Sequence, residues 1–296
     1  MNVLNENHAT AQALPIAPHA AQARRGLLIY FALLIPLSAL FEGLAVITGN
    51  ALWIFALMCV PALASVVARL MLREGFADVS FRLGGQQGWR TIGIGFILPS
   101  VIGILAYGAA WSLGLAQFVG RTQVFGLTVP PALGFAIAVV VRSTITAVFS
   151  SVLAAGEEIG WRGFMLTRLI DADVPQPILV SAAIWGLWHL PLILAGSYAA
   201  GPSRVLSAAL FLIGAIAFGT IIAWIRLDSG SIWPAIVLHG VWNAVIQGAF
   251  DPATTGPAAL LWTGESGILT GLVIIGVALI VVRRPWRMLR QPRRGA

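Results

Sequence analysis

Eight apolar runs recur along the chain, separated by short polar connections, and they cover residues 27–47, 51–72, 91–115, 132–155, 176–197, 205–226, 231–250 and 266–282. About 20 consecutive apolar residues in a helix span the hydrocarbon core of a bilayer. Prolines within the runs, such as Pro61 and Pro191, are tolerated in membrane helices because neighbouring helices satisfy the freed backbone carbonyls. The pattern predicts an all-α, polytopic integral membrane helical bundle of about eight transmembrane helices.

The composition agrees with this pattern. Of 296 residues, 58% are hydrophobic and only 10% are charged, whereas an ordinary soluble domain carries about 25% charged residues. We expect a disordered N-terminal tail over residues 1–23, one transmembrane helical domain over residues 24–284, and a basic cytoplasmic tail over residues 285–296.

The arginines predict the topology. The net charge is +7, and all 18 basic residues are arginine. With the N-terminus in the cytoplasm and eight spans, fifteen arginines fall inside, leaving Arg121 and Arg204 outside and Arg142 within a span. The positive-inside rule therefore predicts that both termini are cytoplasmic. Arginines at the ends of apolar runs indicate contact with lipid headgroups rather than nucleic acid. Their exclusive use, with abundant Ala and Gly, suggests a bacterial inner membrane.

Ionisable side chains inside apolar spans are costly, so each of them needs a reason. The first cluster is Glu157-Glu158-Ile-Gly-Trp-Arg162, at the end of the fourth span. In a helix, Glu158 and Arg162 are i,i+4 neighbours and can pair, while Glu157 points about 100° away. This spacing suits one carboxylate held by arginine and one free for chemistry. The alternative is a salt bridge at a helix end.

Two further clusters lie on the fifth and seventh spans. Trp185 and His189 share a helix face, as do His239 and Asn243. For Trp188 we favour a place in an interfacial belt of tryptophans. Taken singly, each cluster is explained by helix packing or an interhelical hydrogen bond.

Together, the clusters supply the groups that acid–base chemistry uses. A carboxylate with an imidazole can hold and deprotonate water, and His and Asn N–H groups can stabilise an oxyanion. The same set could instead hold a divalent metal such as zinc, with Glu157, His189 and His239 as ligands. The sequence leaves open whether a metal is required.

The three motifs, Glu157-Glu158-x-x-x-Arg162, an aromatic-x-x-x-His189 and His239-x-x-x-Asn243, resemble the CPBP intramembrane protease family, which includes type II CAAX prenyl proteases and Abi-like proteins. The resemblance implies an intramembrane endopeptidase, a hydrolase acting on a membrane-associated peptide or protein, with or without a prenyl group. It implies that Glu157 is the general base, helped by His189. Glu158 and Arg162 would be a supporting pair, and His239 and Asn243 would bind the oxyanion. Trp185 stands where the family commonly has Phe, and we expect it to keep an apolar wall.

Counting residues from the helix ends predicts a water-accessible cavity towards the cytoplasmic side of the cell membrane. Two other functions stay open. One is a non-catalytic membrane partner, such as a bacteriocin-immunity or regulatory protein, because a fold alone does not establish activity. The other is transport, since buried carboxylates and histidines also form proton relays.

Overall fold

The computed structural model describes residues 18–201 and 203–283. The helices, in chain order, are α1 (Pro18–Thr48), α2 (Ala51–Leu72), η1 (Ala77–Val79), α3 (Gly85–Ser112), α4 (Pro131–Val141), η2 (Arg142–Thr146), α5 (Ala147–Gly160), η3 (Trp161–Met165), α6 (Leu166–Asp171), α7 (Pro177–Ala195), α8 (Arg204–Ser229), α9 (Trp233–Trp242), η4 (Asn243–Phe250), η5 (Asp251–Ala253), α10 (Ala259–Trp262) and α11 (Ile268–Val282). The segments η2, η3 and η4 are π-helical, while η1 and η5 are 3₁₀ turns. Two antiparallel strand pairs lie in the connections: β1 (Gln117–Phe118) with β4 (Thr254–Thr255), and β2 (Gln123–Val124) with β3 (Leu127–Thr128).

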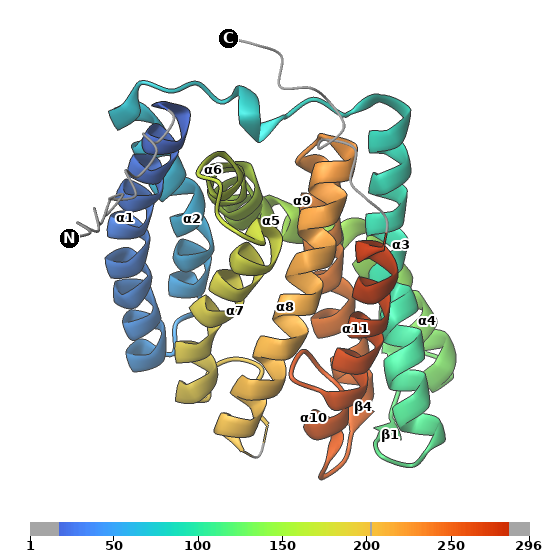
Figure 1. The fold of residues 1–296 in the computed structure, drawn as a ribbon. Helices are drawn as coiled ribbons and strands as arrows, with labels where there is room; N and C mark the ends of the chain where they lie inside the picture. Colours follow the sequence, from blue (N-terminus) through green and yellow to red (C-terminus); the bar gives the residue numbers. More distant parts are fainter. Residues whose placement is uncertain (1–17, 202, 284–296) are drawn as a thin grey trace, which may run out of the picture.

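The fold is an all-helical bundle, as the apolar pattern predicts (Figure 1). Within the described chain, six helices are long and apolar enough to cross a membrane, and they cover His19–Thr48, Ala51–Leu72, Gly85–Ser112, Pro131–Asp171, Pro177–Ala195 and Arg204–Ser229. The last two predicted spans are not among these six helices, because one is less apolar and the other is short. The continuous helix α9–η4 carries His239, Asn243 and Gln247, which make it less apolar, and α11 has only 15 residues.

The long helices of the bundle run between two ends (Figure 1). We call one end the arginine face; it contains η1 and its flanking chain, α6 and the turn between α8 and α9. The opposite end, the loop face, contains the connections 113–130, 196–203 and 251–267. Successive long helices run alternately between the two faces, so that α1 begins at the arginine face and α11 runs back towards it.

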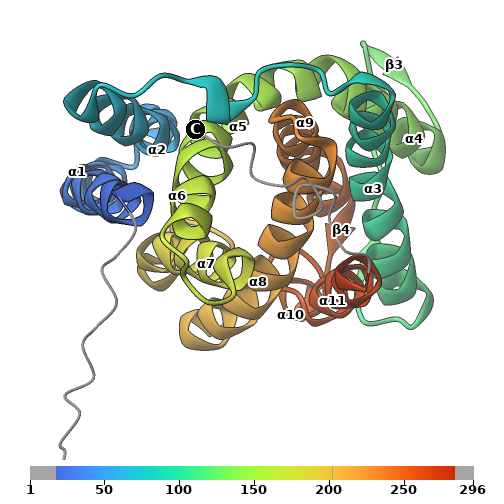
Figure 2. The ribbon, with the colours of Figure 1, turned by 45° about the horizontal axis from the view of Figure 1, so that its top comes forward.

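The segments from α4 to α6 form one continuous helix of 41 residues. It crosses the molecule from α4 on one side to α6 on the other (Figure 2). A straight helix of this length would measure about 60 Å, which is twice the thickness of the hydrocarbon core. Two π-helical segments, η2 and η3, interrupt its α-helical stretches, and such segments are frequent at functional sites. The helix thus carries the first motif through the middle of the bundle.

Glycines let the neighbouring helices approach this central helix closely. A Cβ added to Gly160 would lie 2.3 Å from the backbone carbonyl carbon of Pro61 in α2, and one on Gly156 would lie 2.7 Å from the carbonyl oxygen of Met58. On the other side, a Cβ on Gly240 of α9 would lie 2.2 Å from Ser151 Oγ. Small residues at four-residue spacing are a recurrent means of packing membrane helices. These contacts set the positions of the helices that bear the motifs.

One boundary of the predicted tail is wrong. Residues 18–23 belong to the first turns of α1 rather than to a disordered segment, because Ala20 and Ala23 are buried and Gln22 Nε2 donates to Glu74 at 2.8 Å. The rest of the predicted N-terminal tail and the basic tail at 285–296 lie outside the described residues.

Candidate active site

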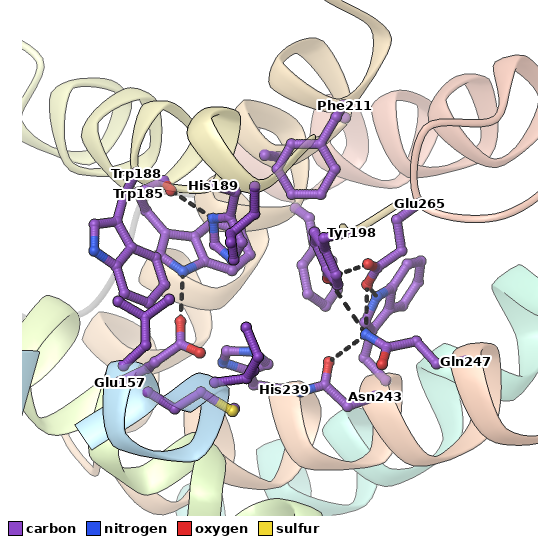
Figure 3. Close-up of a pocket in the computed structure, with 18 of the residues that line it drawn as sticks. Glu157, Trp185, Trp188, His189, Tyr198, Phe211, His239, Asn243, Gln247 and Glu265 are labelled. Atoms are coloured by element: carbon purple, nitrogen blue, oxygen red, sulfur yellow. Dashed lines mark hydrogen bonds between the residues drawn. The ribbon is translucent and has the colours of Figure 1, made fainter. Parts of the chain in front are cut away.

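A cavity of about 160 Å³ lies inside the bundle (Figure 3). Its lining includes one or two members of each motif: Glu157, Trp185, His189, His239 and Asn243. The structure therefore brings together on one cavity side chains that lie on three different helices and span almost ninety positions of the sequence. Glu158 and Arg162 do not line it and lie behind it instead.

Glu157 is held by a side chain from α7. The residue is 2% exposed, and its Oε2 accepts a hydrogen bond from Trp185 Nε1 at 2.9 Å. The other carboxyl oxygen points away from Trp185 into the cavity (Figure 3). Trp185 therefore does more than the apolar wall expected from the sequence, since phenylalanine has no N–H to donate. Trp185 also packs against the Arg162 guanidinium, whose carbon lies 4.8 Å from the ring centroid.

Glu158 joins Arg162 and His239 in a fully buried cluster. Its Oε1 accepts from Arg162 Nη1 at 2.9 Å, as the i,i+4 spacing predicts, and from His239 Nδ1 at 2.8 Å. Both Glu158 and Arg162 have an exposed fraction of 0%. Because a carboxylate oxygen only accepts, His239 Nδ1 carries a hydrogen. The Nε2 atom of His239 is then the nitrogen available to the cavity.

His189 is oriented by its own helix. Its Nδ1 lies 2.8 Å from the backbone carbonyl oxygen of Trp185. The carbonyl can only accept, so Nδ1 is the protonated nitrogen, and in neutral imidazole Nε2 is left as an acceptor. The ring is enclosed by aromatic side chains, with centroids 4.9 Å from Trp188 and 5.1 Å from Phe211.

Asn243 is part of a polar network that the motifs did not reveal. Gln247 Nε2 lies 3.4 Å from Asn243 Oδ1 and 3.2 Å from Glu265 Oε1. Trp242 Nε1 donates to the same oxygen of Glu265 at 2.6 Å, and the Tyr198 hydroxyl donates to Glu265 Oε2. Burial raises the pKa of Tyr198 well above its ordinary value, and the Glu265 carboxylate raises it further, so the phenol stays protonated.

This network orients the Asn243 amide. With Oδ1 on Gln247, the amino group lies on the side of His239 (Figure 3). The sequence held one signal for it, because Gln247 follows Asn243 by four residues on the same helix face. Glu265 and Tyr198 come from connections at the loop face, and no spacing rule links them to the motifs.

Trp188 also lines the cavity instead of standing in an interfacial belt. Its Nε1 donates to Ser38 Oγ of α1 at 2.7 Å.

The candidate metal ligands do not form a metal site. Within residues 18–201 and 203–283, no three His, Cys, Asp or Glu side chains are grouped so that they could hold a metal ion. Glu157, His189 and His239 line the same cavity, but these three side chains are not grouped so that they could hold one ion. The residues that the structure describes therefore do not fit a three-ligand metal centre.

The fold and this cavity define a polytopic membrane protein whose helical bundle encloses a cavity lined in part by carboxyl, imidazole and amide side chains. The family model described as type II CAAX prenyl endopeptidase Rce1-like matches residues 133–245, the segment that contains all three motifs. The match supports the CPBP/CAAX protease family for this chain, and that family is one of hydrolases that act on membrane-associated peptides or proteins. None of the curated proteins matches the chain.

Proposed function

We propose that the protein is an intramembrane endopeptidase that hydrolyses a peptide bond of a membrane-associated peptide or protein by a glutamate mechanism. One observation carries the proposal: Glu157, His189, His239 and Asn243 line a single cavity, whereas the Glu158–Arg162 pair supports it from behind.

Glu157 and His189 activate the water. The free oxygen of Glu157 accepts one proton of the water, and His189 Nε2 accepts a hydrogen bond from the other O–H. The indole N–H of Trp185 holds the carboxyl group so that this oxygen faces the cavity. A positioned carboxylate base typically contributes about 10²–10⁴-fold to a rate.

His239 and Asn243 stabilise the oxyanion. His239 Nε2 and Asn243 Nδ2 donate to the carbonyl oxygen as negative charge develops on it. Two carboxylates and one guanidinium leave one negative charge in this buried cluster, and a protonated His239 balances it. Glu158 supports this charge state, because its hydrogen bond with His239 Nδ1 favours the imidazolium.

The protons and bonds balance without another reactant. The water oxygen bonds to the carbonyl carbon while one proton passes to Glu157. Collapse of the tetrahedral intermediate breaks the C–N bond, and Glu157 returns the proton to the leaving amine. The second water proton leaves with the new carboxyl group.

For the topology, we propose eight crossings with both termini in the cytoplasm, in a bacterial inner membrane. The α9–η4 helix and α11 are the seventh and eighth crossings, since both run between the two faces. The arginines of the described chain support this orientation, because Arg121 and Arg204 alone lie in loop-face connections or at their edge.

The test is a comparison of cellular peptide termini between the wild-type strain and a Glu157→Ala strain. The proposal expects new termini, in membrane-associated proteins, that are present only in the wild type, and these termini name the substrate. Identical termini, with the cellular phenotype kept in Glu157→Ala, would support a non-catalytic partner instead. Synthetic peptides spanning the identified bond, with and without a prenyl group, then decide whether the lipid is recognised.

A further inference from the structure

The cavity lies in the loop-face half of the bundle. From α2, its lining residues are Ile54, Leu57 and Met58, all within the first eight residues from the loop face. From α7 they include Leu192, close to the helix end, and Ser197 and Tyr198 follow in the connection at the loop face. The motif residues mark the inner end of this cavity near the middle of the bundle.

The helix starts explain this depth. The α7 helix begins at Pro177 on the arginine face, so His189 lies twelve residues in, or about 18 Å at 1.5 Å per residue. The close approach of Gly156 to Met58 places the neighbouring Glu157 opposite a part of α2 that is nearer the loop face.

The arginine face is closed to the cavity. Behind Glu157 lie Glu158, Arg162 and Trp161, each with an exposed fraction of 0%. Above them η1 is fixed across the bundle end, where Asp78 accepts from Arg69 at 2.6 Å and from Arg168 at 3.0 Å.

Further contacts hold η1 and the chain beside it in place at the arginine face. Arg226 Nη2 donates to the backbone carbonyl of Asp78 at 2.7 Å, and Arg69 Nη2 donates to the carbonyl of Gly163 at 3.0 Å. Val79 is fully buried and would meet a Cβ on Gly163 at 3.1 Å. A polypeptide entering from this face would have to displace a bonded ion-pair network.

The loop-face end of the cavity reaches the surface. Among the lining residues, Ser197 and Gln247 are the exposed ones, and both lie towards this face. The Tyr198–Glu265–Gln247 network gives the opening polar groups that can hydrogen-bond an extended backbone.

We infer that the cavity takes its polypeptide from the loop face, which the positive-inside rule places on the extracytoplasmic side of the membrane. The substrate class is then a polypeptide segment exposed outside the cytoplasm or in the outer half of the bilayer. The assignment of this segment as a substrate rests on the proposed peptidase function, whereas the direction of access does not.

The experiment is cysteine accessibility in spheroplasts that express the full chain. Cys59 is the only cysteine and is exposed on α2, so Cys59→Ser gives the background. Single variants Ser197→Cys and Gln247→Cys report the loop face and the cavity, and Ala77→Cys in η1, also exposed, reports the arginine face. The probe is a membrane-impermeant thiol reagent, applied before and after permeabilisation.

The inference expects Ser197→Cys and Gln247→Cys to be labelled in intact spheroplasts, and Ala77→Cys only after permeabilisation. The reverse pattern would overturn the orientation. Labelling of Ser197→Cys but not of Gln247→Cys from outside would overturn access to the cavity. These readouts need no catalysis, so an inactive protein with the expected labelling would defeat the proposed function and leave the direction of access standing.

Discussion

The indole N–H of Trp185 donates to Glu157 Oε2 at 2.9 Å, which joins the second motif to the first inside the bundle. A phenylalanine at this position would leave the carboxyl group without that donor. This hydrogen bond holds one carboxyl oxygen of Glu157 against the Trp185 side chain of α7 and leaves the other oxygen facing the cavity (Figure 3).

Trp185→Phe should lower the turnover of a cleaved peptide by roughly tenfold, because a hydrogen bond to a charged group contributes about 1.5–3 kcal/mol. The protein should still fold, since the aromatic ring remains. The matched control is Trp188→Phe, which removes an N–H that bonds to Ser38 instead of Glu157. Equal losses in the two variants would mean that the Trp185 bond has no special part in catalysis.

Gln247→Ala should lower kcat about threefold, because it frees the Asn243 amide to rotate. The effect is modest because the Gln247–Asn243 distance of 3.4 Å is long for a hydrogen bond. In an Asn243→Ala background the same substitution should cost nothing more, which a double-mutant cycle measures. Gln87→Ala, which breaks a bond to Asp228 near the arginine face, is the control. If the losses of kcat from Gln247→Ala and Asn243→Ala instead add in the double variant, Gln247 does not act by positioning Asn243.

Gly160→Ala should destabilise the bundle by about 1–3 kcal/mol, the usual cost of overpacking a closely packed core. The added Cβ would lie 2.3–2.5 Å from atoms of Pro61, most of them backbone, which cannot swing aside. Thermal unfolding in detergent measures the effect. Gly93→Ala on α3 is the control, because its Cβ would meet nothing within 4 Å. A Gly160→Ala protein as stable as Gly93→Ala would show that α2 can move away at no cost.

Asp78 should stabilise the arginine face in a pH-dependent way. Burial raises the pKa of Asp78, but the hydrogen bond from Arg69 and the charges of Arg69 and Arg168 lower it more, so the pKa lies below its ordinary value. A depressed carboxyl pKa stabilises the fold above the unfolded value of about 4, and this contribution is lost as the pH falls through the folded value.

The Tm difference between wild type and Asp78→Asn should therefore be steady at neutral pH and shrink below about pH 4. The control is Asp171→Asn. The Asp171 side chain is 52% exposed and lies 3.5 Å from Arg168, so the Tm difference between wild type and this variant should be smaller. A difference that grows towards acid pH would contradict this account of the ion pairs.

The sequence predicted the helical class and the residues that meet at the cavity for a simple reason. Residues at i,i+4 spacing share a helix face. Ionisable side chains in apolar membrane helices face the interior of the bundle, where they can meet one another. That reasoning grouped Glu157, His189, His239 and Asn243, all four of which line the cavity.

Other features depended on tertiary contacts that no local pattern encodes. The bond from Trp185 to Glu157 joins two different helices, and the glycine contacts of the central helix with α2 help to set the position of Glu157. Glu265 lies in the connection between η4 and α11, and only the fold brings it to Gln247. The depth of the cavity also depends on the fold, because the starting faces of helices do not fix where polar side chains meet.

The most direct measurement is cleavage of a peptide library by the purified protein in liposomes, comparing wild type with Glu157→Gln. This substitution keeps the shape and size of the side chain and removes the base. Glu74→Gln, which alters a carboxylate at the arginine face bonded to Arg168 at 2.5 Å, serves as the control. The account predicts cleavage by wild type and Glu74→Gln and its loss in Glu157→Gln. Undiminished cleavage by Glu157→Gln would contradict the glutamate mechanism.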